Sequence, residues 1–292
     1  MVRPTVISTF AGCGGSSLGY QMAGFHELLA VEWDQNAVDT FRLNFPNVPV
    51  YHGDIMKLTG DECMKLAGIE KGTLDVLDGS PPCQGFSTAG KRKFDDPRNS
   101  LFKEYARLLM ELQPKAFVME NVTGMVKGCM KQAYLQIIKT LRECGYNAKG
   151  EILNAKYYGV PQSRERVIII GFREDLGIEP SHPKPETRPI KGNLVVSELK
   201  DTRFLSWRNK GRRDDLLLLG KLPIGITKKG IDLEGRKLYR DPDGVKLFFS
   251  FPKDYIFIGT QQEQLNRIGN SVPPLLMKAI AGHVKNVLED RL

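Results

Sequence analysis

The chain has 292 residues, of which 41% are hydrophobic and 26% are charged. This balance is typical of a folded globular protein and excludes a disordered or fibrous chain. No run approaches the ~18 consecutive apolar residues of a membrane-spanning helix, so no membrane partner is expected. The formal charge of +8 favours a polyanionic partner only weakly, because a basic surface also serves solubility.

Cysteine usage and the N-terminus bear on the cellular compartment. The five cysteines are irregularly spaced, they include no Cys-x-x-Cys pair, and the chain has only four histidines. A disulfide framework and a structural zinc site are therefore not expected, and we predict no metal. The first residues lead into a glycine-rich stretch without the basic start and cleavage site of a signal peptide, which predicts a cytosolic protein.

Short β-branched runs alternate with amphipathic stretches from residue 4 to about 172, the pattern of a mostly parallel sheet covered by helices. The predicted strands span 4–10, 27–33, 48–51, 74–78, 115–120, 147–153 and 166–172. The predicted helices span about 16–23, 35–44, 100–112, 131–143 and 273–290, the last returning to the first half of the chain. These elements predict a doubly wound α/β fold of Rossmann-like type, whose ligands bind at the carboxyl ends of the strands.

The sequence changes character after Phe172. Four prolines fall between residues 180 and 189, and no alternation of strand and helix follows until about residue 260. Residues 179–263 contain 17 Lys and Arg against 12 Asp and Glu, an excess that is most of the chain's net charge. We predict one large domain from residues 1–178 and 264–292, and a small irregular domain from 179–263 that is the better candidate for contacting phosphates.

Three successive predicted strands end in residues suited to binding a nucleoside. The first ends in the glycine-rich run Phe10–Gly19, which lets a ligand approach backbone N–H groups and would suit a dinucleotide, a phosphate or S-adenosylmethionine equally. The second ends in Glu32 and Trp33, an acceptor for ribose hydroxyls and a ring that can stack on adenine. Asp54 follows the third strand as an acceptor for the adenine amino group.

The fourth predicted strand leads into Asp78-Gly-Ser-Pro-Pro-Cys83-Gln-Gly-Phe-Ser87. A single cysteine is more often a small buried hydrophobe than a nucleophile. Here Pro81 and Pro82 remove two backbone donors and direct the chain out of the sheet, so Cys83 is expected at an exposed strand end. Such a thiol becomes a useful nucleophile where its surroundings favour the thiolate.

Two later segments place one acidic and two basic side chains at the same edge of the predicted sheet. The predicted strand 115–120 ends at Glu120, which near a nucleophile could hold a proton. Arg164 and Arg166 precede the next strand two residues apart, so strand alternation places both on one face. Beside Cys83 they could bind a phosphate or a base carbonyl.

Taken together, these segments resemble the DNA cytosine-5 methyltransferases of bacterial modification systems. The matching blocks, in the family's order, are Phe10–Gly19, Glu32-Trp33, Gly53-Asp54, Ser80–Ser87, Glu120-Asn121-Val122, Gln162–Arg166 and Arg267–Pro274. The Pro-Pro-Cys-Gln and Gly-Asn-Ser-Val-Pro-Pro blocks are specific when found together, whereas many folds share the glycine-rich turn.

The resemblance implies that Cys83 adds to carbon 6 of a flipped cytosine, assisted by the catalytic residues Glu120, Arg164 and Arg166. It implies S-adenosylmethionine as the methyl donor and S-adenosylhomocysteine as the product. The implied cofactor-binding residues are Phe10, Ala11, Gly12, Cys13, Gly14, Gly15, Glu32, Trp33, Asp54, Ile55, Pro82, Leu101, Asn270 and Val272. The expected DNA contacts, on the loop 85–100 and next to Cys83, are Gln84, Ser87, Lys91, Arg92, Lys93 and Arg98.

The implied partner is double-stranded DNA, with a companion restriction endonuclease as a further expectation and a monomer as the expected state. The chain departs from the family in having Ser8 and Thr9 before Phe10, where an acidic residue is usual. It also has Gly244-Val-Lys-Leu-Phe-Phe-Ser in place of a helical element containing Arg-Glu, and its 179–263 region, the expected target-recognition domain, is short.

Three alternatives stay open. A cytosine-5 methyltransferase acting on transfer RNA would carry Cys-Phe-Thr in the recognition region, and this chain has no such triplet. An adenine amino-methyltransferase would place an aromatic residue after the paired prolines, where this chain has Cys83. The third alternative is a catalytically silent DNA-binding relative; the short recognition region favours it, and the intact Cys83, Glu120 and Arg164 argue against it.

Overall fold

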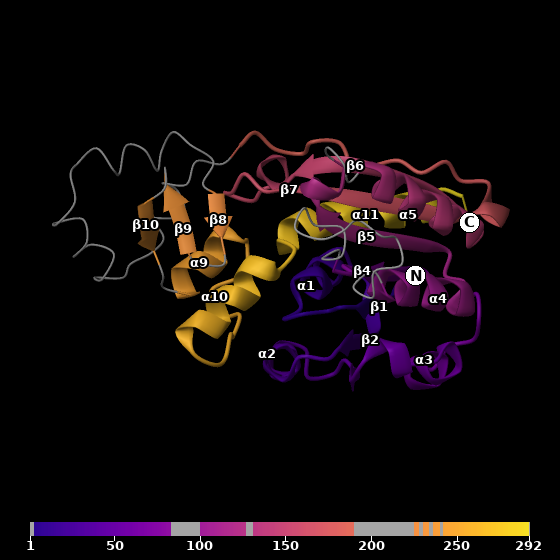
Figure 1. Ribbon diagram of the computed structural model, residues 1–292, viewed down its shortest axis with the longest axis horizontal. Helices are drawn as coiled ribbons and strands as arrows, with labels where there is room; N and C mark the ends of the chain where they lie inside the picture. The colour runs from indigo at the N-terminus through magenta and orange to yellow at the C-terminus, as the bar shows by residue number, and fades with distance from the viewer. Residues whose placement is uncertain are drawn as a thin grey trace.

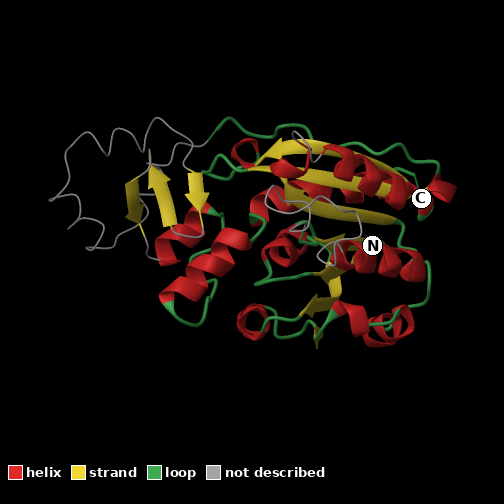
Figure 2. Cartoon of the chain, viewed as in Figure 1, coloured by secondary structure: helices red, strands yellow, loops and turns green. Residues whose placement is uncertain are grey.

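The computed structural model describes residues 3–82, 100–126, 131–189, 225–227, 230–233, 236–239 and 242–291. In these ranges a seven-stranded sheet has helices on both faces, and a three-stranded sheet lies to one side of it (Figures 1 and 2). No helix of the described residues is long and apolar enough to cross a membrane.

The large sheet and the helices around it follow the predicted order along the chain. Its strands are β1 (Thr5–Thr9), β2 (His26–Glu32), β3 (Val50–His52), β4 (Val76–Gly79), β5 (Ala116–Val122), β6 (Tyr146–Asn154) and β7 (Glu165–Arg173). The helices are α1 (Gly15–Met22), α2 (Gln35–Asn44), α3 (Gly60–Ala67), α4 (Ser100–Leu112), α5 (Lys131–Glu143), α9 (Pro242–Phe248), α10 (Gln261–Asn270) and α11 (Pro274–Glu289). Single 3₁₀ turns are η1 (Ile55–Lys57), η4 (Thr123–Val126), η6 (Ala155–Tyr157) and η7 (Glu174–Leu176).

The strand order is β3-β2-β1-β4-β5-β7-β6. Neighbouring strands from β3 to β5 are parallel, and β7 is antiparallel to both β5 and β6, so the prediction of a mostly parallel, doubly wound sheet is confirmed. Thr9 lies opposite Val31 and Gly79, and Gly79 lies opposite Met119. Because these four residues form one row, the residues that follow them share one edge of the sheet.

Side-chain alternation along each strand fills two cores. Val76 and Val118 face α1 and α11, whereas their neighbours Leu77 and Phe117 face the side covered by α3, α4 and α5. The helices α1 and α11 pack closely, since a Cβ at Gly19 would lie 2.5 Å from the Cβ of Met277. The predicted return of the final helix to the first half of the chain is therefore confirmed.

The structure adds elements that the sequence did not predict. The short helix α3 begins at the N-cap Thr59, whose hydroxyl accepts from the Glu62 amide, and ends at Gly68 in the left-handed conformation. The region 179–263 was predicted to be irregular, and it is described only in part. Its described part contains the antiparallel strands β8 (Gly225–Thr227), β9 (Gly230–Leu233) and β10 (Arg236–Tyr239), followed by α9.

Helix α9 occupies the stretch in which the sequence departs from the family's helical element, so that departure does not remove a helix from this position. Phe248 and Phe249 at the end of α9 join a third core with Phe41 of α2 and Leu265 of α10. The predicted domain bounds, 1–178 with 264–292 and 179–263, stay predictions.

Candidate active site

The turn after β1 forms one wall of the candidate site. Phe10, Gly12 and Gly14 have φ angles of 55°, 55° and 89°, a run of left-handed backbone that bends the chain sharply before α1. A Cβ at Gly14 would lie 2.4 Å from the ring of Phe45, so this side of the turn is filled. A Cβ at Gly12 would meet nothing within 4 Å. The turn therefore has its open side at Gly12.

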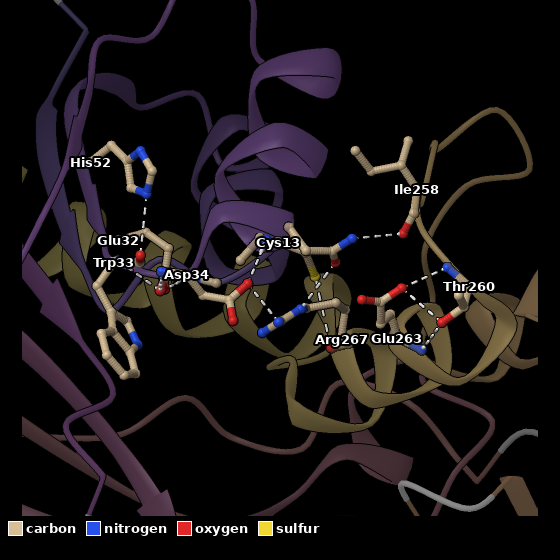
Figure 3. Close-up of polar contacts among 12 residues, drawn as sticks. Cys13, Glu32, Trp33, Asp34, His52, Ile258, Thr260, Glu263 and Arg267 are labelled. Atoms are coloured by element: carbon tan, nitrogen blue, oxygen red, sulfur yellow. Dashed lines mark hydrogen bonds and ion pairs between the residues drawn. The ribbon is translucent and has the colours of Figure 1, made fainter.

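The carboxylate of Glu32 ties the ends of β1 and β2 together (Figure 3). Its Oε2 accepts from the Gly12 amide at 2.8 Å, and its Oε1 accepts from the amides of Trp33 and Asp34 at 2.9 Å each. A carboxylate has about four acceptor positions, and these bonds use three of them. One acceptor position, on Oε2, is left for a ligand hydroxyl. Glu32 is therefore expected to accept from one ribose hydroxyl rather than from both.

The residues after β2 and β3 add an exposed indole ring and a second carboxylate to the candidate site. Trp33 is 77% exposed, far more than a core tryptophan, and its carbonyl oxygen lies 3.2 Å from Nε2 of His52. Asp54 is exposed, and its Oδ1 caps η1 by accepting from the Met56 amide. Ile55 is buried in the core, so its side chain packs behind the site rather than lining an open surface.

The β4 loop is held against the end of β5. The side-chain amide of Asn121 donates to the Pro81 carbonyl at 2.9 Å, and Pro81 is buried whereas Pro82 is exposed. Cys83 follows directly. Cys83 itself and the predicted DNA contacts Gln84, Ser87, Lys91, Arg92, Lys93 and Arg98 lie outside the described residues.

An ion pair joins β5 and β7 next to this loop. Antiparallel pairing sets Val122 opposite Arg166, and Nε of Arg166 lies 2.7 Å from Oε1 of Glu120. The two side chains are only 17% and 11% exposed, so each charge depends on the other. The structure thus brings Glu120 and Arg166 together at the sheet edge where the sequence predicted them.

Arg164 anchors the C-terminal segment, residues 267–274. Its Nη2 donates to the carbonyl oxygens of Gly269 and Ser271 at 3.0 and 3.1 Å, and its guanidinium lies 5.0 Å from the centre of the Phe249 ring. Burial, and then the charge of Arg166, lower the pKa of the Arg164 guanidinium to about 9. Arg164 therefore stays charged at neutral pH while it holds the chain on either side of Asn270.

The C-terminal segment closes onto the β1 turn. A Cβ at Gly15 would lie 2.4 Å from the Val272 carbonyl oxygen, and Sγ of Cys13 lies 2.9 Å from Oγ of Ser271. Burial raises the pKa of the Cys13 thiol to about 11, so Cys13 is a structural group and not a nucleophile. Val272 is buried and its carbonyl lies against the turn, whereas Asn270, two residues earlier, is exposed.

Leu101 and Ala11 complete the predicted set. Leu101 is partly buried in the first turn of α4 and packs against the core on that side of the sheet. Ala11 is buried, and its amide donates to the Val31 carbonyl at 3.1 Å. Neither the Ala11 side chain nor its amide is therefore available to a ligand.

Sequence reasoning missed the residues that hold the site together. Gln162 donates to the Phe248 carbonyl at 3.2 Å, and the Tyr255 hydroxyl donates to the Cys13 carbonyl. Arg267 pairs with Asp34, which also caps α2 by accepting from the Ala37 amide. An Asp directly before a predicted helix is an N-cap signal, so only the capping role of Asp34 was open to prediction from the sequence.

Two carboxyl groups are buried behind the site, beneath α1. Burial raises the pKa of Asp78 well above its ordinary value, and the charge of Glu27 raises it further. The Tyr20 hydroxyl donates to Asp78 at 3.3 Å. Burial also raises the pKa of Glu27 to about 7, and the bond that the Ser17 hydroxyl donates at 2.8 Å opposes this only in part.

We predict that Glu27→Gln stabilises the protein at alkaline pH. Above the unfolded pKa near 4.5 an unfolded chain releases the Glu27 proton while the folded chain keeps it, so stability falls as pH rises to about 7. The variant lacks this loss and should exceed wild type by up to about 3 kcal/mol at pH 8, with little difference near pH 4.5. Urea unfolding from pH 5 to 8 measures this. Glu143→Gln, at a side chain 58% exposed, is the control, and parallel curves for Glu27→Gln and wild type would refute the prediction.

Comparison with known proteins identifies the family. The family described as C-5 cytosine-specific DNA methylase matches residues 4–224 and 232–286. The type II methyltransferase M1.HphI of Haemophilus parahaemolyticus is 35% identical over 95% of this chain and 85% of its own length. M.HindV of Haemophilus influenzae is 33% identical over 96% of both chains.

Solved structures share the fold. A prophage-encoded E. coli protein superposes with a TM-score of 0.77 at 23% identity, covering 98% of this chain and 99% of its own. The Dnmt2 methyltransferase of S. pombe gives a TM-score of 0.67 at 17% identity, covering 99% of each chain. Since the family match extends over nearly the whole sequence and both relatives exceed 30% identity, the chain belongs to the C-5 cytosine-specific DNA methylase family.

Proposed function

We propose that this DNA cytosine-5 methyltransferase attacks carbon 6 of a flipped cytosine with Cys83, and that Glu120, Arg164 and Arg166 form the other side of the base pocket. One observation carries the proposal. The start of the loop after β4 is bonded to β5, because Asn121 donates to the Pro81 carbonyl, and the neighbouring Glu120 pairs with Arg166 at the same carboxyl edge of the sheet. This is the edge at which ligands bind in doubly wound folds.

The described residues fit S-adenosylmethionine at the neighbouring strand ends. The open side of the turn at Gly12, the remaining acceptor position of Glu32 and the exposed ring of Trp33 offer space, a hydroxyl acceptor and a stacking surface. Asp54 accepts one bond through Oδ1, and Oδ2 accepts none among the described residues, which suits an adenine amino group. When bound, S-adenosylmethionine supplies an electrophilic methyl group.

Cytosine carbon 5 is a weak nucleophile until a group adds at carbon 6. The Cys83 sulfur forms a bond to carbon 6, and the electron pair of the 5,6 double bond moves toward carbon 5. Glu120 accepts a hydrogen bond from the exocyclic amine and passes a proton to N3, and Arg166 keeps the Glu120 carboxylate in place. Arg164 and Arg166 are proposed to hold the pyrimidine carbonyl and the nearby backbone. After carbon 5 is methylated, water takes the proton on carbon 5, the 5,6 double bond re-forms, N3 returns its proton to Glu120, and Cys83 leaves carbon 6 as a thiolate.

The target atoms are unreachable inside a stacked duplex, so the base must leave the helix, at a cost of roughly a few kcal/mol. The basic residues of the loop 85–100 and of the region 179–263 are proposed to contact the DNA backbone. The chain is proposed to act as a monomer. By likeness to relatives named type II methyltransferases, it is also proposed to accompany a restriction endonuclease.

A single experiment tests the proposed activity. We expect a plasmid recovered from cells that express the protein to show, by bisulfite sequencing, protected cytosines in one short sequence context. The empty vector gives the background, and transfer of labelled methyl groups from S-adenosylmethionine to purified duplex DNA gives the rate. If the label enters transfer RNA and not duplex DNA, the substrate is transfer RNA and the proposal of DNA is wrong. If the label enters neither, the result favours a catalytically silent DNA-binding relative.

A further inference from the structure

One residue outside the expected cofactor set touches three walls of the candidate pocket (Figure 3). Nη2 of Arg267, on α10, lies 2.5 Å from Oδ1 of Asp34, and its Nε donates to Oδ1 of Asn36 at 3.2 Å. The carbonyl oxygen of Arg267 accepts from the Ser271 hydroxyl at 2.7 Å and from the Cys13 thiol at 3.8 Å. Arg267 thus joins the turn after β2, the turn after β1 and the C-terminal segment.

We propose that Arg267 is a positioning residue for the cofactor pocket, which acts through Asp34 to hold the Glu32-Trp33 turn in its binding conformation. The inference rests on the proposed S-adenosylmethionine site and extends it to a residue that touches no cofactor. Asp34 follows Trp33 directly, and its amide shares Oε1 of Glu32 with the Trp33 amide. A shift of Asp34 therefore moves both groups that face the adenosine.

The start of helix α10, the end farther from Arg267, is held by hydrogen bonds of its own. Helix α10 begins with a capping box, in which the Thr260 hydroxyl accepts from the Glu263 amide and the Glu263 carboxylate accepts from the Thr260 amide. The side-chain amide of Asn36 donates to the Ile258 carbonyl at 3.2 Å, just before that cap. The segment before α10 and Arg267 near its end therefore both bond to Asn36 of α2, so the pair of Arg267 with Asp34 is part of a wider contact between the two helices.

The charge state of Asp34 agrees with this role. Burial alone would raise its pKa, but the bond from the Ala37 amide and the charge of Arg267 outweigh burial, and the pKa lies below its ordinary value. Asp34 is therefore anionic at neutral pH. The side chains of Arg267 and Asp34 are 21% and 33% exposed, so the pair is partly shielded from solvent.

The test measures binding of S-adenosylhomocysteine to purified apoprotein by titration calorimetry. Arg267→Ala should raise Kd about tenfold, the size expected for a partly shielded charge pair that fixes a binding turn. Asp34→Asn keeps an equally good N-cap for α2 and removes the charge, so it should weaken binding by a similar factor. The double variant should bind no more weakly than either single one, and Arg267→Lys should fall between wild type and Arg267→Ala.

Arg173 supplies a matched control. Its Nε lies 2.7 Å from Oδ1 of Asp175 at the end of β7, and its side chain is 23% exposed, close to the 21% of Arg267, although Asp175 is 61% exposed. Arg173→Ala should lower the melting temperature and leave Kd within about twofold of wild type. Equal melting losses for Arg267→Ala and Arg173→Ala with unchanged Kd for both would overturn the inference. Wild-type protein that binds no S-adenosylhomocysteine would instead overturn the proposed cofactor site, and the inference with it.

Trp33 provides a readout that needs no ligand. The chain has two tryptophans, so Trp207→Phe leaves Trp33 as the only indole emitter. In that background Arg267→Ala should lower the fluorescence anisotropy of Trp33 in the apoprotein, because the turn loses its tie to α10. Arg173→Ala should leave the anisotropy unchanged, and equal anisotropy in all three proteins would contradict the positioning role.

Discussion

Replacing Cys83 with serine should lower methyl transfer to duplex DNA by at least about a thousandfold. The reaction needs a nucleophile that adds to carbon 6 and later leaves, and a serine hydroxyl is far less ionised than a thiol at neutral pH. Single-turnover incorporation of labelled methyl groups measures the loss. Duplex DNA with 5-fluorocytosine at the target should form a denaturant-resistant complex with wild type and none with Cys83→Ser, since fluorine cannot leave carbon 5 as a proton does.

Cys144 is the matched control for the first prediction. It is a free thiol at the end of α5, half-buried, with Sγ 3.8 Å from the Ala106 carbonyl oxygen. Burial raises the pKa of Cys144, so its thiol is not activated. Cys144→Ser should keep near-normal turnover, and Cys83→Ser should still bind S-adenosylhomocysteine. Robust methylation by Cys83→Ser would sink the assigned mechanism.

Replacing Glu120 with glutamine should slow methyl transfer by about 10²- to 10⁴-fold, the range of a positioned acid or base. Glutamine keeps the shape of the side chain but cannot pass a proton to N3. The addition of Cys83 to carbon 6 therefore loses the proton transfer that assists it. The rate at which the complex with 5-fluorocytosine DNA forms isolates this step from the later ones. It should fall in parallel with turnover, while Kd for S-adenosylhomocysteine changes little.

A second glutamate tests whether the loss is specific. Glu151 on β6 pairs with Lys149 at 2.7 Å, and Glu151→Gln should leave turnover within about twofold of wild type, as expected for an exposed pair. If Glu120→Gln forms the complex as fast as wild type but releases product slowly, Glu120 acts after the addition step and the proposed role is wrong.

The catalytic edge could be predicted because it follows from strand order alone. Parallel strands joined by helices bring their carboxyl ends together, so Glu32, Glu120 and the Pro81-Pro82 loop meet once each strand is identified. The strand register agrees with this, because Val31, Thr9, Gly79 and Met119 lie opposite one another in one row across the sheet. The antiparallel direction of β7 was not predicted, because a continuous apolar run such as Val167–Ile170 gives no sign of strand direction.

The contacts that hold the site could not be predicted, because they join residues far apart in the chain. Nothing in the local sequence links Arg164 to the carbonyl oxygens of Gly269 and Ser271, or Arg267 to Asp34. The three bonds that Glu32 accepts from backbone amides were equally hidden. The bond from the Gly12 amide depends on the left-handed conformation of the β1 turn, which glycines permit but do not specify. The other two bonds come from the adjacent Trp33 and Asp34 amides.

Most of the missed elements are short, although α10 has ten residues. Strand β8 has three residues and helix α9 has seven, too few for hydrophobic periodicity to distinguish them from loops. Helix α9 forms because Phe248 and Phe249 pack in the third core, beneath Arg164 and against α2 and α10. Tertiary packing, rather than local propensity, therefore decides this part of the chain.

The packing of α11 on α1 also has a consequence for biosynthesis. The β1 turn and α1 emerge from the ribosome early, but the segment that touches Gly15 and Gly19 of α1 lies beyond residue 270. Until that segment has been made, the turn lacks the Ser271 and Val272 contacts, and the nascent chain exposes the apolar face that α11 later covers. The enzyme is therefore expected to gain its cofactor affinity in one late step of synthesis, and a partly made chain should leave the host's DNA unmethylated.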